Sequence, residues 1–130
     1  MDNTKQWLSR YRNNQARVAR LQERLDALDM RIESIQSQGC MSGGDNLDTL
    51  SADRSELQHR IDRLSDRGRV IRTEICEAID ALDNPRYREV LTALYIDGNS
   101  IQSIADNMGY SERRIYTLYS EGVAAISKIG

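Results

Sequence analysis

The side chains best suited to bind another molecule lie near the end of the chain, in the run Ser111-Glu112-Arg113-Arg114. Two guanidinium groups, a hydroxyl and the unpaired N–H groups at the start of a helix are donors for phosphate oxygens and for the acceptor edges of bases. An outward polar and aromatic face would extend this set along the same helix, through Tyr116, Thr117 and Ser120. An earlier segment adds the cations Arg86 and Arg88. These nine residues are therefore the candidate contacts for double-stranded DNA.

The remaining reactive residue types do not form a catalytic or metal-binding pattern. The single histidine, His59, lies between Gln58 and Arg60 and is predicted to be a solvated helix residue. Zinc sites need about four ligands, usually in close pairs, whereas Cys40 and Cys76 are far apart and form no CxxC motif. We expect Cys76 to be a small core residue and Cys40 a loop thiol. We expect no enzymatic activity, no cofactor and no metal.

Three short helices are predicted to position the candidate residues. Asp83-Asn84-Pro85 predicts a helix start, because proline suits a first turn and either residue before it can cap the helix. That helix would end at Asp97-Gly98-Asn99. Ser100 would cap a second helix, from Ile101 to about Asn107, and Ser111 would cap a third.

The second and third helices have the residue pattern of a helix-turn-helix. Ala105 is small enough for the third helix to cross directly over it, and Gly109 can adopt the positive φ that a tight turn requires. Apolar residues at matching offsets would bury the two helices against each other: Ile104, Met108, Ile115 and Leu118. The pattern predicts that the third helix enters the major groove of DNA. The alternative is an ordinary αα-corner with the same packing and no DNA contact.

Residues 83–91, 95–105 and 108–116 resemble region 4 of sigma-70-type RNA polymerase sigma factors. With a helical arm in front, the chain resembles the small phage-encoded sigma-like regulators of the ArpU and RinA type, which control late or structural genes. The resemblance implies that Ser111, Arg113, Arg114 and Thr117 lie where region 4 contacts its DNA. Glu112, Arg113 and Thr117 depart from the residues usual in sigma factors, so recognition of the standard −35 element is not expected.

The first part of the chain predicts two long helices, each with one apolar stripe. Steps of three and four residues place the first stripe on Trp7, Tyr11, Asn14, Val18, Leu21, Leu25, Leu28, Ile32 and Ile35, and the second on Leu57, Ile61, Leu64, Gly68, Ile71, Ile75, Ala78 and Leu82. A glycine-rich polar segment separates them. An antiparallel hairpin satisfies both stripes; an intermolecular coiled coil, or a hairpin whose remaining apolar edge pairs with a second copy, is the alternative.

Two residues in these stripes have open interpretations. Asn14 either fixes the register of a buried seam or lies where the helix end has separated into water. Gly68 marks either a close approach of two helices or a kink, because glycine costs about 1 kcal/mol of helix propensity relative to alanine.

Composition restricts the function further. The 130 residues carry 18 basic and 20 acidic side chains, and a net charge of −2 gives little non-specific attraction to DNA. No apolar run of about 18 residues occurs, and the N-terminus lacks the apolar stretch of a signal peptide, so a cytoplasmic protein with no membrane partner is expected.

The sequence therefore predicts an all-α protein in two parts. Residues 1–82 would form a helical hairpin or coiled-coil arm with a loop at about 38–49, and residues 83–130 a helix-turn-helix domain. We expect a sequence-specific DNA-binding transcription regulator of phage or prophage origin, whose arm dimerises or contacts RNA polymerase. The alternatives are a small terminase-like DNA-packaging adaptor and a protein-interaction module that docks on RNA polymerase.

Overall fold

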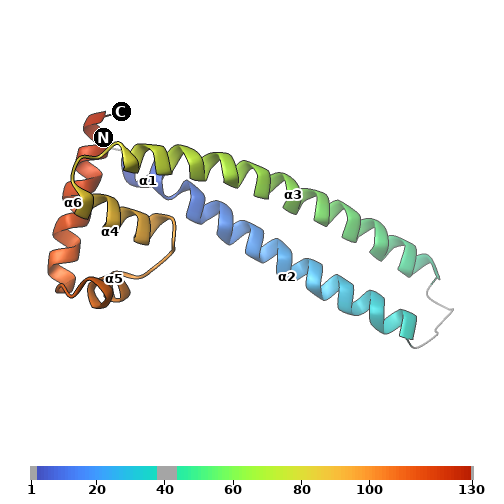
Figure 1. Cartoon of the computed structure of the whole chain (residues 1–130). Coiled ribbons are helices and arrows are strands. Elements are labelled where there is room, and N and C mark those ends of the chain that lie inside the picture. The colour runs from blue at the N-terminus through green and yellow to red at the C-terminus, as the bar shows by residue number, and fades with distance from the viewer. Residues whose placement is uncertain (1–2, 38–43, 130) are drawn as a thin grey trace. The chain divides into compact units, whose positions relative to one another are not determined.

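The computed structural model describes residues 3–37 and 44–129, and within these ranges it contains helices and connections but no strand (Figure 1). The helices are α1 (Thr4–Leu8), α2 (Arg10–Ser37), α3 (Gly44–Asp80), α4 (Pro85–Tyr95), α5 (Ile101–Met108) and α6 (Glu112–Ile129). The prediction of an all-α fold is confirmed. Among these residues no helix is long and apolar enough to cross a membrane.

The chain divides into two compact units, and α2 and α3 each contribute to both. Residues 14–67 form one unit, which we call the hairpin unit. Residues 1–13 and 68–130 form the other, the helical unit. The boundary predicted at Asp83 is therefore not the edge of a compact unit. It marks the change from α3 to α4.

In the hairpin unit, α2 and α3 run antiparallel and side by side (Figure 1). Leu25, Leu57 and Ile61 are buried between them, and Val18, Leu21 and Leu28 pack against this cluster. Asp29 on α2 and Arg54 on α3 form an ion pair across the hairpin. The predicted hairpin is confirmed, with the two stripes paired within one chain. Its second helix starts earlier than predicted, at Gly44, so part of the expected loop at 38–49 is helical and residues 38–43 lie outside the described residues.

Asn14 lies buried in the hairpin unit, with 6% of its surface exposed. Its side-chain Nδ2 donates a hydrogen bond of 3.1 Å to the backbone carbonyl of Leu64. Of the two interpretations offered by the sequence, the structure therefore supports a polar residue inside the seam.

The core of the helical unit joins residues from both ends of the chain. Its buried members are Leu8, Ile75, Ile79, Leu82, Leu91, Tyr95, Val123 and Ile126. Because Leu8 and the last turns of α3 pack with α4 and α6, these segments belong to the same unit as the C-terminal helices. Gly68 is buried within α3, which stays helical through this position.

Three details of the helical unit differ from the predicted pattern. Ile79 is fully buried, whereas Ala78, which the stripe predicted, is half-buried. Cys76 is half-buried instead of fully inside the core, and Cys40 lies outside the described residues. The first helix is interrupted at Ser9, so Trp7 belongs to the short helix α1 and Tyr11 to α2.

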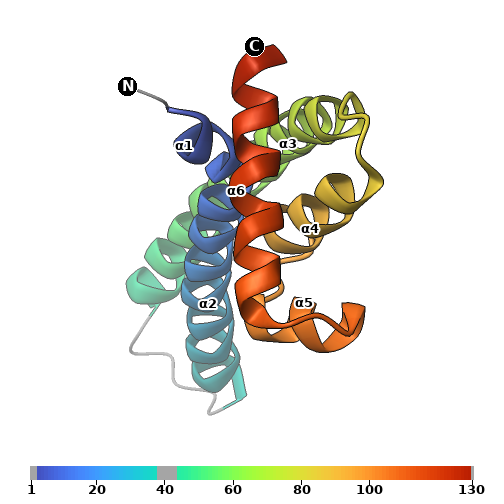
Figure 2. The same cartoon turned by 90° about the vertical axis from the view of Figure 1, so that its left-hand side faces the viewer.

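A second cluster of the helical unit connects α4, α5 and α6. Val90, Ile104, Ala105, Ile115 and Leu118 are all at most 3% exposed, and Met108 packs against them. Figure 2 shows α6 beside α4, with α5 at the N-terminal end of α6. The predicted helix-turn-helix packing is present, with α5 as its first helix and α6 as its second.

Candidate nucleic-acid interface

The connection from α5 to α6 is fixed by local hydrogen bonds and one glycine. Gly109 has φ +71°, in the left-handed region, and its N–H donates to the carbonyl of Ala105. The N–H of Tyr110 donates to the same carbonyl at 3.0 Å. These bonds end α5 and turn the chain sharply, as the glycine predicted.

Both helices of the motif begin with the predicted serine cap. The Oγ of Ser100 accepts a hydrogen bond of 3.1 Å from the N–H of Ser103, and the Oγ of Ser111 accepts one of 3.1 Å from the N–H of Arg114. Asn84 caps α4 in the same way, accepting from the N–H of Arg86 at 2.9 Å. The starts of all three C-terminal helices were therefore readable from sequence.

The first half of α6 presents an exposed face, while Ile115 and Leu118 on its other side are buried against α4 and α5. Seven of the nine candidate residues belong to this face and all seven are exposed: Ser111, Glu112, Arg113, Arg114, Tyr116, Thr117 and Ser120. The aromatic ring on this face, that of Tyr116, is 54% exposed. Further along the helix, Gly122, Val123 and Ile126 are buried. Buried residues in both halves of α6 thus hold the orientation of its exposed face.

Two of these residues also interact with α6 itself. The hydroxyl of Thr117 donates to the carbonyl of Arg113 at 3.1 Å, so its methyl group and oxygen lone pairs are what it presents outward. Glu112 lies in the first turn of α6, where its negative charge interacts favourably with the positive end of the helix dipole and stabilises the helix.

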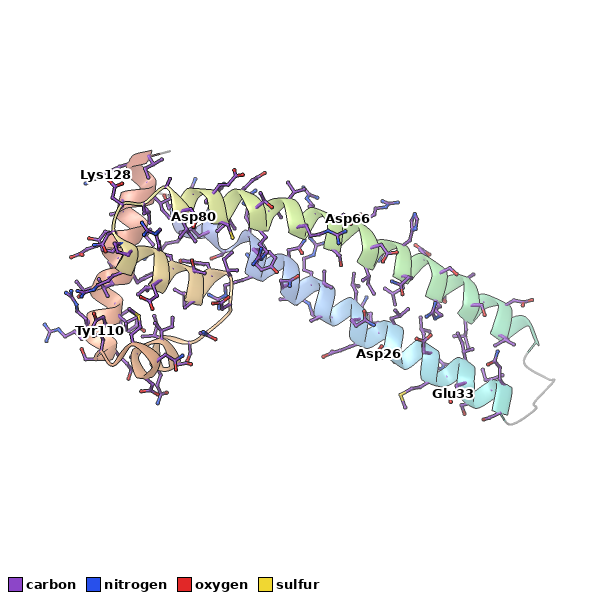
Figure 3. All side chains as sticks on the ribbon, viewed as in Figure 1. Asp26, Glu33, Asp66, Asp80, Tyr110 and Lys128 are labelled. Carbon is purple, nitrogen blue, oxygen red and sulfur yellow. The ribbon has the colours of Figure 1, made fainter. Side chains whose placement is uncertain are left out.

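The two arginines of α4 have different roles. Arg86 is exposed, and its guanidinium lies over the ring of Tyr110, 5.8 Å from the centroid. Because Tyr110 lies in the turn between α5 and α6 (labelled in Figure 3), Arg86 lies beside that turn. Arg88 is half-buried, and its Nη1 donates to the backbone carbonyls of Leu82 and Asp83. The structure brings Arg86 to the candidate interface and uses Arg88 to hold the connection between α3 and α4.

The sequence did not predict the contacts between α4 and α6. The hydroxyl of Tyr87 donates to the carboxylate of Glu121 at 2.8 Å, and this hydrogen bond raises the pKa of Tyr87 above its ordinary value. The positive charge of Arg114 acts in the opposite direction on the same pKa. Gly122 lies at a close contact between α4 and α6: a Cβ there would meet Leu91 Cδ1 at 3.1 Å and Tyr87 Cβ at 3.3 Å. A glycine within a helical pattern was the available signal for this close approach.

No group of three His, Cys, Asp or Glu side chains that could hold a metal ion occurs in the part of the chain that the structure describes.

Comparison with known proteins adds one similarity. Residues 68–127 are similar to a family described as a protein of unknown function, DUF1492. The match begins at Gly68, where the helical unit resumes after the hairpin unit, and runs through α4, α5 and most of α6. No curated protein and no solved structure matches the chain.

Proposed function

We propose that this protein is a sequence-specific DNA-binding regulator of transcription that inserts the first half of α6 into the major groove. The observation that carries the proposal is the exposed row on α6, from Ser111 to Ser120, held by a capped and buried helix-turn-helix. Among the described residues Arg113 and Arg114 form no ion pair, and Tyr116 is 54% exposed, so these side chains are available to a ligand.

The dimensions and chemistry of α6 suit this role. A major groove about 12 Å wide admits one helix, and the exposed residues lie in the first half of α6, whose other side is buried against α4 and α5. Arg113 and Arg114 can each form a bidentate contact with guanine or bind a phosphate. Arg86, beside the turn, is suited to a flanking phosphate.

We extend the proposal to the biological class suggested by the sequence resemblance. The protein would be a sigma region 4-like regulator of phage or prophage origin, acting in the cytoplasm of a bacterial host. Its helical arm would pair with a second copy or contact RNA polymerase. A dimer would bind two half-sites and so compensate for the weak overall charge.

Selection of fragments from the source genome by the full-length chain tests the proposal. We expect enrichment of one sequence motif. Arg113→Ala and Arg114→Ala should each weaken binding to the selected site by roughly 1–3 kcal/mol if they are bidentate to guanine. Arg72→Ala removes the same charge from an exposed position on α3 and is the matched control.

Two results would contradict the proposal. The first is the absence of any enriched sequence. The second is unchanged affinity of both α6 variants for the selected site, with helicity and melting temperature intact. Mass determination in solution separates the regulator from a packaging adaptor, which requires a ring of many copies.

A further inference from the structure

One groove of the hairpin unit is lined mainly by arginines. Arg17, Arg20 and Arg24 from α2 and Arg60, Arg63 and Arg67 from α3 surround a floor formed by Leu21 and Leu64, in a groove of about 570 Å³. All six arginines are exposed. No carboxylate belongs to the lining, although the chain as a whole has a net charge of −2.

The arginines face each other across the groove. The antiparallel register that joins Asp29 to Arg54 brings Arg24 close to the level of Arg60, and Arg17 close to that of Arg67. Facing positions at the edge of a helix pair commonly carry opposite charges, which stabilise the pairing, whereas like charges repel. The helical unit has such an opposite pair, Arg10–Glu74 at 2.7 Å. Within residues 3–37 and 44–129, none of the six groove arginines forms an ion pair.

A groove of arginines without ion-pair partners among the described residues is suited to an anionic ligand. Each row covers seven residue steps, or about 10 Å of helix at about 1.5 Å per residue. Six charges over this length give about one charge per 1.7 Å, which is close to the linear charge density of duplex DNA. The planar guanidinium fork also matches the geometry of phosphate oxygens better than a lysine ammonium does.

An acidic protein helix fits the groove less well. Carboxylates on one helix face recur every three or four residues, or about every 5 Å. A helical peptide would need acidic residues at nearly every position to neutralise six arginines over this length, and such blocks of like charge repel one another and favour disorder.

We infer that the arginine groove of the hairpin unit binds the phosphodiester backbone of duplex DNA, independently of base sequence. The inference deepens the proposed function and rests on it in one respect: the ligand belongs to the class that α6 would read. The groove contributes affinity for any duplex, and α6 contributes discrimination between sequences.

Salt dependence of binding tests this assignment on the full-length chain. The probe is a fluorescein-labelled DNA duplex of mixed sequence, and its Kd is measured by anisotropy over a series of salt concentrations. The variant Arg24→Gln/Arg60→Gln removes one facing pair, and Arg12→Gln/Arg72→Gln removes the same charge from exposed positions of α2 and α3 outside the groove. We expect the groove variant to weaken binding and to reduce the slope of log Kd against log salt by about 2, while the control keeps the wild-type slope.

The groove variant should remain folded, because it removes two like charges that face each other. Since Arg24 and Arg60 also line an adjoining groove with Asp53 and Glu56, its melting temperature is expected to stay close to that of the wild type. If the groove variant is folded and keeps the wild-type slope of log Kd against log salt, the inference is overturned. The inference would also be overturned if the groove variant bound labelled poly-glutamate more weakly than the wild type but bound the duplex equally well. The ligand of the groove would then be an acidic protein.

The groove and α6 can fail separately. The groove variant should weaken binding to a selected site and to the mixed duplex equally, so the Kd for the mixed duplex divided by the Kd for the selected site stays unchanged. Arg113→Ala should lower this ratio and keep the slope for the mixed duplex. A groove-dependent slope without any sequence discrimination would contradict the proposed regulator and support the groove. If the protein discriminates between sequences but the groove variant keeps the wild-type slope, the result would support the proposed regulator and contradict the role of the groove.

Discussion

At the scale of single residues, the arginines differ in what they contact. Arg88 donates to backbone carbonyls at the end of α3, Arg10 pairs with Glu74, and Arg113 is exposed to solvent. An arginine near a candidate site is therefore not evidence for ligand binding until its contacts are known. The pair Arg86 and Arg88, two positions apart in sequence, makes this difference testable.

Arg88→Ala is expected to reduce stability and not DNA affinity. It leaves the carbonyls of Leu82 and Asp83 without a charged donor, and hydrogen bonds to charged groups contribute about 1.5–3 kcal/mol. Since Arg88 is only half-buried, we expect a loss of about 1–2 kcal/mol in the free energy of unfolding, measured by urea denaturation. Arg86→Ala, the neighbouring control, should change stability by less than about 0.5 kcal/mol and weaken DNA binding. A stable Arg88→Ala variant with reduced DNA affinity would contradict this division of roles.

Gly109→Ala should destabilise the protein through the backbone alone. The residue has φ +71°, and no heavy atom lies within 4 Å of a Cβ built at this position, so no clash contributes. A left-handed conformation costs an L-residue roughly 1–2 kcal/mol, and asparagine tolerates it better than alanine. Urea denaturation should therefore rank the variants glycine, asparagine, alanine. Equal stability of all three would show that the turn does not require a left-handed residue.

At the scale of elements, the close contact between α4 and α6 depends on Gly122. Gly122→Val would press a branched side chain against Leu91 and Tyr87, and overpacking of this kind costs about 1–3 kcal/mol. We expect a lower melting temperature and weaker DNA binding, because α4 helps to hold α6. Ala124→Val places the same side chain at an exposed position of α6 and should have little effect on either measurement. Equal melting temperatures of the two variants would mean that the helices can separate without cost.

The hairpin unit contains a polar residue whose replacement should increase stability. Asn14 is buried and donates to the carbonyl of Leu64, but its Oδ1 has no hydrogen-bond partner among the described residues. An unsatisfied buried polar atom costs about 1–3 kcal/mol, so Asn14→Leu should raise the melting temperature. Single buried polar residues also specify register in paired helices, so we expect the variant to form additional oligomers in solution. A lower melting temperature with an unchanged mass would show that the Asn14–Leu64 bond outweighs both effects.

The sequence predicted those elements whose signals are local. Caps at Asn84, Ser100 and Ser111, and the left-handed turn at Gly109, depend on residues within one helical turn. The two serine caps and the turn were predicted, and Asn84 was one of two residues predicted to cap α4. The apolar stripes of the hairpin were predicted for the same reason, because helical periodicity is a property of the segment itself.

The missed features depend on contacts between distant segments. Burial of Ile79 in place of Ala78, and the assignment of Leu8 to the core of α4 and α6, follow from packing between the two ends of the chain. The carbonyl contacts of Arg88 and the close approach at Gly122 likewise require the position of a neighbouring helix. Periodicity within one segment carries no information about these contacts.

At the scale of the whole molecule, net charge conceals local charge. A value of −2 predicts weak attraction to DNA, yet six arginines share one groove of the hairpin unit. Because Debye screening at physiological salt limits charge effects to about 8 Å, a ligand in the groove responds to these arginines more than to distant carboxylates. Total charge is therefore a poor guide to the ligands of this protein.

The stability of the folded protein should fall at high pH because of Tyr95. Burial, followed by its hydrogen bond of 3.1 Å with the hydroxyl of Tyr119, raises the pKa of Tyr95 above its ordinary value of about 10. In the unfolded chain the phenol returns to that ordinary value. Above about pH 10 the unfolded state therefore releases a proton that the folded state retains, and the free energy of unfolding decreases as pH rises. Below that range both states are protonated and this contribution to stability is fully present.

Tyr95→Phe isolates this effect, because the variant keeps the buried ring and loses the ionisable hydroxyl. We expect a constant difference in unfolding free energy between wild type and variant up to about pH 9. Above about pH 10 the wild type should lose stability faster, by up to about 1.4 kcal/mol per pH unit, which is the value for one proton. If the curves of wild type and Tyr95→Phe run parallel through this range, the Tyr95 hydroxyl has the same pKa in the folded and unfolded protein. Neither burial nor the contact with Tyr119 would then raise that pKa.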